Sequence, residues 1–455
     1  MLFFSFMNVQ QDDAYIFYTY AGNISSGNGY VFNAGERINA TTSPLYTCIL
    51  AFLSFIFHNR DLIPGIAHVL GALSVFFISF LLFKITNRDE LYPTQYFLPL
   101  LFLTNPLLRN AVGMETFLTL LLITLTLFLY LRHKVVAASV MAGLAILSRF
   151  DAVMFAGVLI AEAMIMRKTA ELRKSIIVIF LIIMPWFIFS YFYFGELLPS
   201  TVKIKLLQSI TGYWGRGFIF LKGMPAAFPG GKVVACFYIC TFVIAVLIII
   251  MRKRIEFLKQ RELRLIITWL FLYFIAYCFI LNPPPYPWYF TPFAILFAVG
   301  ITLLLKEMLE SLKPGLLLPV IILIVAIGTV LPIKSLIKPM NSKYVNYKAA
   351  ADWINNNSED PVVAIDEIGV LGYYLKKGKV RDILGLVNPD TWENTASRDL
   401  PEFIRWYKPD FIVADYPDVP EYLQYLNIDE FRKYYSRDHI LGTGERRHLI
   451  YRKQK

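Results

Sequence analysis

Two adjacent carboxylates, Asp12 and Asp13, stand near the start of the chain in the stretch NVQQDDAYIFYTYAGN. A carboxylate pair at a membrane surface can act as a general base, bind a metal ion or cap a helix. The pair follows the apolar segment 1–9, so the order predicts that it ends a first helix. Because an acid at the C-terminal end of a helix opposes the helix dipole, this position favours chemistry over capping.

Basic side chains that could bind an anion follow this pair. Arg37 lies in the loop SSGNGYVFNAGERINATTSPL, whose backbone amides and hydroxyls suit a polar ligand. Its guanidinium can bind a phosphate or a carboxylate with two hydrogen bonds. Lys203 and Lys205 lie further along in GELLPSTVKIK, just outside an apolar segment. Two ammonium groups at that depth suit an anionic lipid head group such as a phosphodiester.

Further candidates lie at the ends of other apolar segments. Glu115 ends the motif GME, and Arg149 and Asp151 belong to SRFDA. Ionisable side chains near the membrane interior are candidates for function, although long ones can simply extend to the interface. The segment NPPPYPWYF could form either an interfacial aromatic belt or a platform for a sugar or an isoprenoid, through Tyr286, Trp288 and Tyr289.

The sequence argues against two kinds of chemistry. The five histidines lack the paired spacing of a metal site, and no Walker motif for nucleotide phosphates is present. A histidine-based metal site and an ATP-driven transporter are therefore not indicated. The cysteines lie inside apolar stretches and are expected to be small core residues: Cys48, Cys236, Cys240 and Cys278.

The composition places all these residues in a membrane protein. Of the 455 residues, 57% are hydrophobic and only 17% are charged, and the mean hydropathy is +0.54. A soluble chain of this length needs a far more polar surface. The net charge of +11 could suggest a nucleic-acid partner, but many of the basic residues lie in short loops between apolar segments. That distribution is typical of membrane orientation and indicates no nucleic-acid binding.

The apolar runs predict an all-α polytopic domain over residues 1–338. A helix crosses a bilayer core with about 20 apolar residues. The segment 1–9 is too short for this and lacks a basic start and a cleavage site. We expect either a truncated first helix or a start codon placed too late, and favour the second. Counting this helix gives about eleven spans, the others lying over 62–83, 91–107, 115–131, 135–148, 152–166, 175–194, 231–251, 265–281, 288–305 and 314–333.

The loops between these runs fall into two alternating sets. Lys and Arg crowd one set and are sparse in the other, so the basic set is expected in the cytoplasm. The alternation requires that 43–57 lies flat at the outer surface as an amphipathic helix. If it crossed instead, every later loop would change sides. With 43–57 flat, the segment 12–61 and everything after residue 334 are extracytoplasmic; the basic loops are 84–90, 131–134, 167–174, 251–264 and 306–313.

Residues 339–455 are mixed and charged in composition and are expected to form a small extracytoplasmic α/β domain. Amphipathic patterns predict helices over 344–357 and 400–406. Strand patterns lie at 361–369, 380–383, 411–415 and 448–453. The glycines of this region are turn formers, because no strand–GxGxxG–helix arrangement is present.

The order of these segments resembles that of the GT-C glycosyltransferases. The resemblance rests on DDAYIFYTYAGN with the loop after it, GME at 113–115, SRFDA at 148–152, GELLPSTVKIK at 195–205 and the aromatic segment near 288–292. It covers about residues 10–300. The branch that the chain resembles most uses polyprenyl-phosphate sugars and includes the arabinofuranosyltransferases. Protein O-mannosyltransferases and the lipid A aminoarabinose transferase are similar at a greater distance.

The resemblance implies a reaction at the outer face of a prokaryotic cytoplasmic membrane. A polyprenyl-phosphate sugar is the donor, and an Asp deprotonates an acceptor hydroxyl, which attacks the anomeric carbon with inversion. Asp12 matches this base, with Asp13 as its partner or as the alternate base. The leaving phosphate needs cations, which could come from Arg37, Arg149, Lys203 or Lys205.

The resemblance also implies a role for a second pair of acids. Glu115 stands where relatives keep an acid that orients the acceptor or binds a divalent metal, and Asp151 is a candidate for the same role. Relatives often have an Arg where Trp288 stands, so another cation must serve here.

Two other functions fit parts of the sequence. A transporter or flippase of lipid-linked saccharides predicts charges near the membrane midplane and internal repeats, and neither is evident. A scaffolding subunit of a cell-envelope complex would not need the polar segment 12–61. The sequence therefore favours an enzyme that acts on a glycan, lipid or protein acceptor, and it names neither the sugar nor the acceptor.

Overall fold

The computed structural model describes residues 11–86, 94–212, 215, 217–251, 260–311, 319, 322, 342–391, 400–416, 428–442 and 447–454. The chain forms two compact units. The first comprises residues 1–7, 68–186 and 215–338, and the second comprises 8–67, 187–214 and 339–455. This division differs from the contiguous domains 1–338 and 339–455 expected from the sequence. Two early segments fold together with the C-terminal part.

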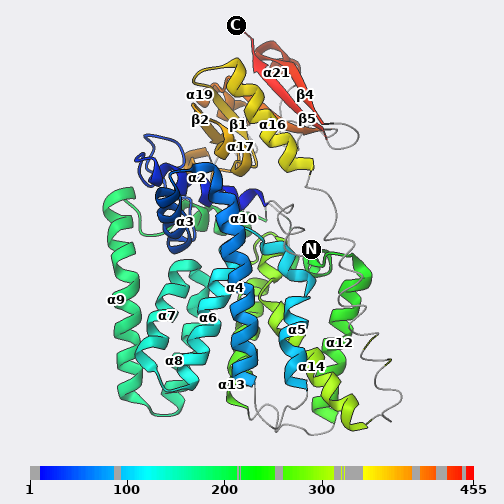
Figure 1. The fold of residues 1–455 in the computed structure, drawn as a ribbon. Helices are drawn as coiled ribbons and strands as arrows, with labels where there is room; N and C mark the ends of the chain where they lie inside the picture. Colours follow the sequence, from blue (N-terminus) through cyan, green and yellow to red (C-terminus); the bar gives the residue numbers. More distant parts are fainter. Residues whose placement is uncertain are drawn as a thin grey trace. The chain divides into compact units, whose positions relative to one another are not determined.

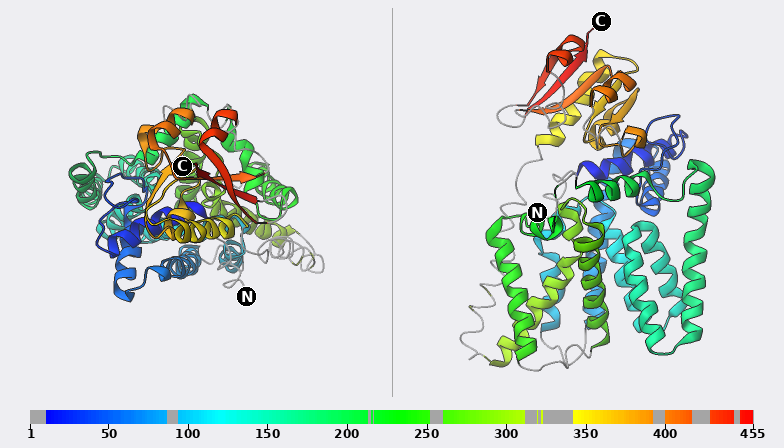
Figure 2. Two further views of the ribbon diagram at one scale, coloured as in Figure 1. Left: turned by 90° about the horizontal axis from the view of Figure 1, so that it is seen from above. Right: turned by 180° about the vertical axis from the view of Figure 1, so that it is seen from behind.

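The first unit is a bundle of helices that run roughly side by side (Figures 1 and 2). Apolar runs form helices in lipid because a helix satisfies its backbone hydrogen bonds within one segment. The main helices, of which α4 and α9 contribute residues to both units, are α4 (Ile63–Thr86), α5 (Phe97–Leu103), α6 (Thr116–Leu131), α7 (Val135–Ser148), α8 (Val153–Ile165), α9 (Thr169–Phe194), α12 (Lys232–Met251), α13 (Arg261–Ile275) and α14 (Phe293–Ser311). Short helical segments lie between them: η3 (Thr94–Tyr96), η4 (Pro106–Ala111), η5 (Phe150–Ala152), α11 (Ile219–Gly223), η6 (Met224–Ala227), η8 (Ala276–Leu281) and η9 (Pro287–Phe290).

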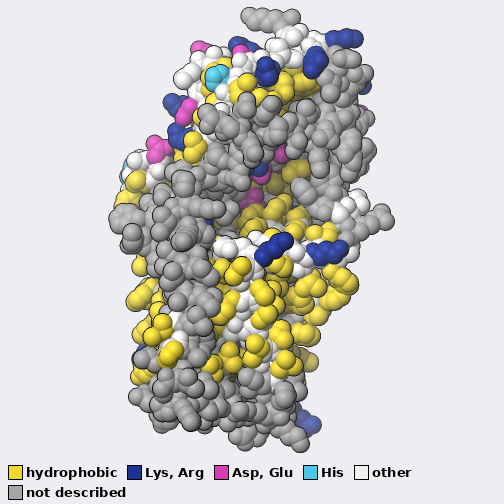
Figure 3. Space-filling model, turned by 90° about the vertical axis from the view of Figure 1, so that its right-hand side faces the viewer, with side chains coloured by type: hydrophobic (Ala, Val, Ile, Leu, Met, Phe, Trp, Pro, Cys, Tyr) yellow, Lys and Arg dark blue, Asp and Glu magenta, His cyan; other side chains and the backbone are white. Residues whose placement is uncertain are grey.

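The helices of the described residues include four that are long and apolar enough to cross a membrane: Arg60–Thr86, Thr169–Phe194, Arg261–Leu281 and Pro287–Lys306. A fifth is added if Ile219–Ala227 and Lys232–Leu247, which meet at 111°, form one span. Hydrophobic side chains cover broad patches of the bundle on the face drawn in Figure 3. The chain is therefore an integral membrane protein. The count of about eleven spans remains a prediction, and the run 314–333 lies almost entirely outside the described residues.

The second unit contains a mixed sheet with the strand order β2-β1-β3-β5-β4. β1 pairs in parallel with β2 and β3, whereas β5 runs antiparallel to both β3 and β4. The strands are β1 (Val362–Ile365), β2 (Lys379–Asp382), β3 (Phe411–Tyr416), β4 (Tyr435–Leu441) and β5 (Arg447–Lys453). The helices that follow residue 339 in the described residues are α16 (Ser342–Asn357), α17 (Gly369–Tyr374), α19 (Leu400–Tyr407) and α21 (Ile428–Tyr434), with the short turn η10 (Pro389–Thr391).

The predicted elements of this α/β region are confirmed within a few residues, and α17, α21 and β4 are additional to them. The apolar strands were predictable because their inward-facing residues form a core. Ala364, Ile412 and Ala414 pack there against Phe403 of α19 and Tyr435 of β4. The additional elements are short, and their charged or glycine-rich sequences carry little periodicity.

The segment 12–61 was expected to be an outer loop with a helix only over 43–57, and it contains a second helix. Its two ends form α2 (Asp12–Ser25) and α3 (Pro44–Phe57). The acids Asp12 and Asp13 occupy the first turn of α2, and Gln11 before them is extended. The expected position at the C-terminal end of a helix is therefore wrong. The helix dipole stabilises negative charge in the first turn rather than opposing it. The segment 1–9 lies outside the described residues.

α3 has two distinct faces. Leu50 and Ala51 are buried, whereas Phe52, Phe55 and Phe57 are 64%, 60% and 56% exposed. This aromatic face suits the interfacial position predicted for 43–57. α2, in contrast, is buried at every residue from Ala14 to Asn23, as expected of a helix that is apolar on all sides.

Candidate functional site

The carboxylate of Asp12 is bound by the start of α17 within the second unit. Its Oδ2 accepts a hydrogen bond from the Gly369 amide at 2.9 Å, and its Oδ1 accepts one from the Val370 amide at 2.8 Å. A Cβ at position 369 would overlap the backbone carbonyl oxygen of Asp12, so glycine is required there. The two amides fix the orientation of the carboxylate and still leave lone pairs for a substrate proton.

A second carboxyl group, Glu367, interacts electrostatically with Asp12 in the same unit. Its Oε1 accepts a hydrogen bond from Nζ of Lys343 in α16 at 2.6 Å. The sequence did not indicate Glu367 or Lys343, because both are remote from Asp12 in the chain. One signal was available: Glu367 follows β1, and functional residues gather at the carboxyl ends of parallel strands.

Burial moves the protonation of these two carboxyl groups toward neutral pH. It raises the pKa of Asp12 from 3.8 to about 6, although the amides of Val370 and Gly369 lower this pKa. It also raises the pKa of Glu367 to about 8, and the negative charge of Asp12 adds to this rise. At pH 7, Asp12 is therefore mostly ionised and Glu367 mostly protonated. A general base works best when its pKa lies near the operating pH.

Asp13 has a different environment from its neighbour. Burial raises the pKa of Asp13, and the ammonium group of Lys205 lowers it. Lys205 belongs to α10 (Ser200–Thr211), which is part of the same unit. The structure thus brings Asp13 and one predicted phosphate-binding cation into electrostatic contact.

The other two predicted cations of the second unit have partners of their own. Nζ of Lys203 lies 2.7 Å from Oε1 of Glu196, and both side chains are about half exposed. The guanidinium of Arg37 lies 4.7 Å from the centre of the Tyr193 ring. Both cations are exposed at the surface of the unit, where a ligand could reach them.

The loop that carries Arg37 is fastened at two places. Nδ2 of Asn23 in α2 donates hydrogen bonds to the carbonyls of Val31 and Phe32. Glu36 accepts hydrogen bonds from Lys379 and Arg381 of β2. These contacts tie α2, the loop and the sheet into one body, and this body positions Asp12.

A second polar cluster lies in the first unit around Arg149. Its Nη1 donates to Oε1 of Glu115 at 2.7 Å, and its Nη2 donates to Oδ2 of Asp151 at 2.8 Å. The hydroxyl of Tyr277 donates to Asp151 at 2.7 Å. The side chains of Arg149, Glu115 and Asp151 are only 12%, 2% and 13% exposed. The sequence singled out all three charges, but as separate candidates for phosphate and acceptor.

The ion pairs change what Arg149 can do. Two carboxylates already compensate its single positive charge, so the cluster is net negative and does not favour a phosphate. A pocket of about 250 Å³ adjoins it, lined by Arg149 and Asp151 together with Thr116, Trp269, Tyr273 and five further residues. Oε2 of Glu115 is buried and has no hydrogen-bond partner among the described residues.

The predicted aromatic platform packs next to this cluster. The Tyr286 and Trp288 rings stack at 4.6 Å with an interplanar angle of 6°, and the Arg149 guanidinium lies 5.6 Å from the centre of the Tyr289 ring. Trp288 and Tyr289 are buried, each only 8% exposed, whereas Tyr286 is half-buried. Of the three, Tyr286 has the most accessible face for a sugar.

The part of the chain that the structure describes contains no group of three or more His, Cys, Asp or Glu side chains close enough to hold a metal ion. Glu115 and Asp151, the two acids expected to orient the acceptor or bind a divalent metal, both form ion pairs with Arg149. The described residues therefore do not fit a metal site.

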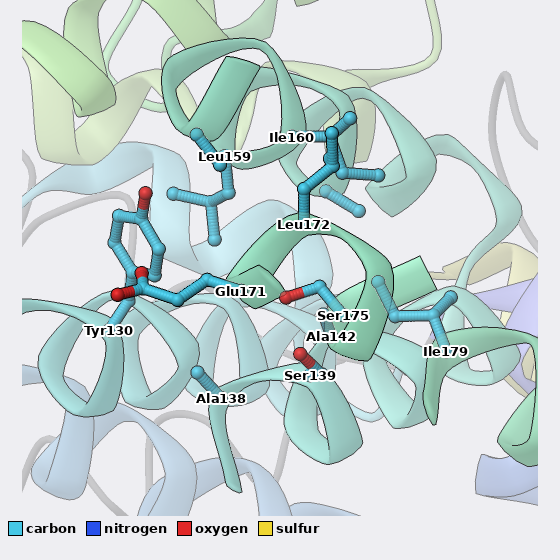
Figure 4. Close-up of a pocket in the computed structure, with 12 residues that line it drawn as sticks. Tyr130, Ala138, Ser139, Ala142, Leu159, Ile160, Glu171, Leu172, Ser175 and Ile179 are labelled. Carbon is cyan, nitrogen blue, oxygen red and sulfur yellow. The ribbon is translucent and has the colours of Figure 1, made fainter. Parts of the chain in front are cut away.

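A larger pocket of about 390 Å³ lies between α6, α7, α8 and α9 of the first unit (Figure 4). Tyr130, Ser139, Glu171 and Ser175 give it polar groups, and leucine, isoleucine and alanine side chains form the rest. It contains none of the predicted site residues. The candidate site is therefore placed at the carboxylate clusters and not in this pocket.

The fold of the chain is similar to the folds of two solved structures, an ArnT and an oligosaccharyltransferase. ArnT from Cupriavidus metallidurans, in its apo crystal structure, is 14% identical, with a TM-score of 0.58 and coverage of 96% of this chain and 93% of that chain. The Archaeoglobus fulgidus oligosaccharyltransferase, in complex with Zn and sulfate, is 13% identical, with a TM-score of 0.52. That match covers 89% of this chain but only 64% of the oligosaccharyltransferase. At these identities the likeness shows the fold alone.

The sequence comparisons add one match. Residues 338–451 match a family described as a domain of unknown function (DUF8728). No curated protein matches the chain. The similarity to the arabinofuranosyltransferase branch thus remains a prediction.

Proposed function

We propose that this chain is an inverting membrane glycosyltransferase that uses a polyprenyl-phosphate sugar as donor. The fold that it shares with two transferases supports this class. The observation that carries the proposal is the state of Asp12. Its carboxylate is oriented by two amides, and burial brings its pKa to about 6, as a general base requires.

In the proposed step, an acceptor hydroxyl oxygen attacks the anomeric carbon of the donor while its proton passes to Asp12. The bond between the anomeric carbon and the phosphate oxygen breaks, and polyprenyl phosphate leaves with the bonding electrons. Attack from the face opposite the leaving group inverts the configuration. Asp13 is the alternate base, because burial raises its pKa as well.

Cations placed where negative charge develops stabilise the transition state. We assign the leaving phosphate first to Lys205, with Lys203 and Arg37 as further cations of the same unit. Arg149 is less suited, because Glu115 and Asp151 already neutralise it. We assign these two acids to the orientation of the acceptor, and the exposed part of the Tyr286 ring to packing against a sugar or an isoprenoid.

A donor screen tests this function. Purified protein in liposomes is incubated with a panel of polyprenyl-phosphate sugars and with candidate glycan, lipid and protein acceptors. We expect one donor to yield a glycosylated acceptor of inverted configuration together with free polyprenyl phosphate. Movement of a donor between leaflets with its sugar still attached would instead support a flippase.

The orientation of the chain is a separate proposal. We infer a prokaryotic cytoplasmic membrane, with Asp12 and the α/β domain on the extracytoplasmic side. In a cysteine-free background, His133→Cys should resist a membrane-impermeant maleimide in intact cells, whereas Glu359→Cys should react. Both positions are exposed, so permeabilised cells should label both and serve as the control. The opposite pattern in intact cells overturns the orientation.

A further inference from the structure

We propose that the C-terminal α/β domain, through residues 367–370 and Lys343, is the positioning element of the Asp12 base. The inference rests on the proposed function for the identity of that base. It gives residues 338–451, which match a domain of unknown function, a part in the reaction. Residues 367–370 and Lys343 are positioning residues in this proposal, because they act through Asp12.

The contacts between α2 and this domain are extensive. Beyond the two hydrogen bonds to the carboxylate, the Tyr15 ring lies 5.4 Å from the Tyr373 ring, 5.7 Å from Tyr344 and 6.0 Å from Tyr374, measured between ring centres. Gly369 approaches the Asp12 backbone so closely that no side chain fits between them. The domain therefore holds both the main chain and the carboxylate of this residue.

The charges around Asp12 come from three directions. Asp13 stands on α2, Lys343 on α16, and Asp366 and Glu367 directly before α17. Farther out, Lys205 of α10 interacts electrostatically with Asp13, and the hydroxyls of Tyr18, Tyr344 and Tyr374 interact with that of Tyr15. Lys343 and the two amides are the groups that favour ionised Asp12, and all three belong to the C-terminal domain.

A direct test follows the protonation of Asp12 without using catalysis. Carbodiimides react with protonated carboxyl groups, so modification of the Asp12 peptide, followed by mass spectrometry, should fall as the pH rises through about 6. Gly369→Ala displaces the amides, and it should raise this midpoint by about one pH unit or more. Gly65→Ala is the matched control, because a Cβ there meets nothing within 4 Å; it should leave the midpoint unchanged.

A second pair of variants avoids the packed glycine. Lys343→Met removes a cation that lowers the pKa of both Asp12 and Glu367, so both midpoints should rise. Glu367→Gln, which imitates the protonated side chain, should remove the transition near pH 8 and leave that of Asp12 near 6. The side chains of Lys343 and Glu367 are 31% and 37% exposed, so both variants should fold.

The outcomes separate this inference from the proposed function. Positioning is refuted if folded Gly369→Ala and Lys343→Met both keep the wild-type midpoint of Asp12. If the wild type transfers no sugar from any donor, the proposed function fails. The carbodiimide midpoints then still test whether the C-terminal domain controls the protonation of Asp12. If transfer is found, Gly369→Ala should lower kcat on the order of 10²-fold, as expected for a misplaced base.

Discussion

Replacing Asp12 with Asn is expected to lower sugar transfer by about 10²–10⁴-fold, the usual contribution of a general base. The asparagine side chain keeps one acceptor oxygen for one of the two amides, and its NH2 group faces the other. The measurement is transfer from the donor identified in the screen, in proteoliposomes, with the unfolding temperature recorded for each variant.

Asp13→Asn is the matched control, since it changes the neighbouring residue in the same turn of α2. If Asp12 is the base, Asp13→Asn should reduce transfer by much less than Asp12→Asn. The reverse order would assign the base to Asp13. Full activity of a folded Asp12→Asn, Asp13→Asn double variant would rule out both.

The pH dependence of the reaction follows from the same carboxylate. Asp12 must be ionised to accept a proton, so kcat/KM should fall about tenfold per pH unit below the pKa of about 6. The effect on stability has the opposite sign. Because the folded pKa is raised above 3.8, the contribution of Asp12 to stability is complete below that value and is lost as the pH rises through 6. In the proposed reaction, the site gives up stability at neutral pH for a usable base.

The local sequence singles out the two acids but does not indicate which groups bind them. Asp12 and Asp13 stand out because adjacent carboxylates are rare in so apolar a stretch. The groups that bind Asp12, the amides of Gly369 and Val370, lie more than 350 residues away in the chain. No periodicity or spacing connects residues at that distance. Their juxtaposition depends on how α17, which follows β1, packs against α2.

The fold also shows that local patterns do not predict which distant segments pack together. Apolar runs and strand patterns predicted most helices of the bundle and four of the strands, because burial imposes its period directly on the sequence. They did not predict that 8–67 and 187–214 join the C-terminal residues in one unit. The patterns also did not predict the helix α2, which was expected to be part of a loop. Its apolar residues point in all directions and give no helical stripe.

Arg149 is a residue whose surroundings in the structure differ from those expected from the sequence. The sequence predicts a phosphate ligand, whereas the structure shows a buried charge shared by Glu115 and Asp151. The interpretation changes the expected effect of mutation. Arg149→Met leaves two buried carboxylates without their cation, which should cost about 3–5 kcal/mol of stability. Thermal unfolding of the detergent-solubilised protein measures this loss.

Arg264→Met provides the matched control, because Arg264 pairs with Glu162 but is 50% exposed. An exposed pair is worth about 0–1 kcal/mol, so this variant should unfold close to the wild type. Neutralising the acids should restore part of the loss: Glu115→Gln and Asp151→Asn in the Arg149→Met background should raise the unfolding temperature again. The unfolding temperature of Arg149→Lys should lie between those of the wild type and Arg149→Met. An ammonium group keeps the positive charge but lacks the planar fork that binds two carboxylates.

The same variants decide between the two roles of Arg149. If Arg149 only holds the fold, its replacement should lower the unfolding temperature, and neutralising Glu115 and Asp151 should restore stability. If Arg149 instead binds the phosphate of the sugar donor, its replacement should raise KM for the lipid-phosphate sugar at unchanged stability. Neutralising the two acids should then not restore the wild-type KM. We expect the first result, because every hydrogen bond from the guanidinium nitrogens already goes to Glu115, Asp151, Thr116 or Tyr277. A phosphate could bind there only by displacing a buried carboxylate. It would gain little Coulomb attraction, because Glu115 and Asp151 already compensate the charge of Arg149.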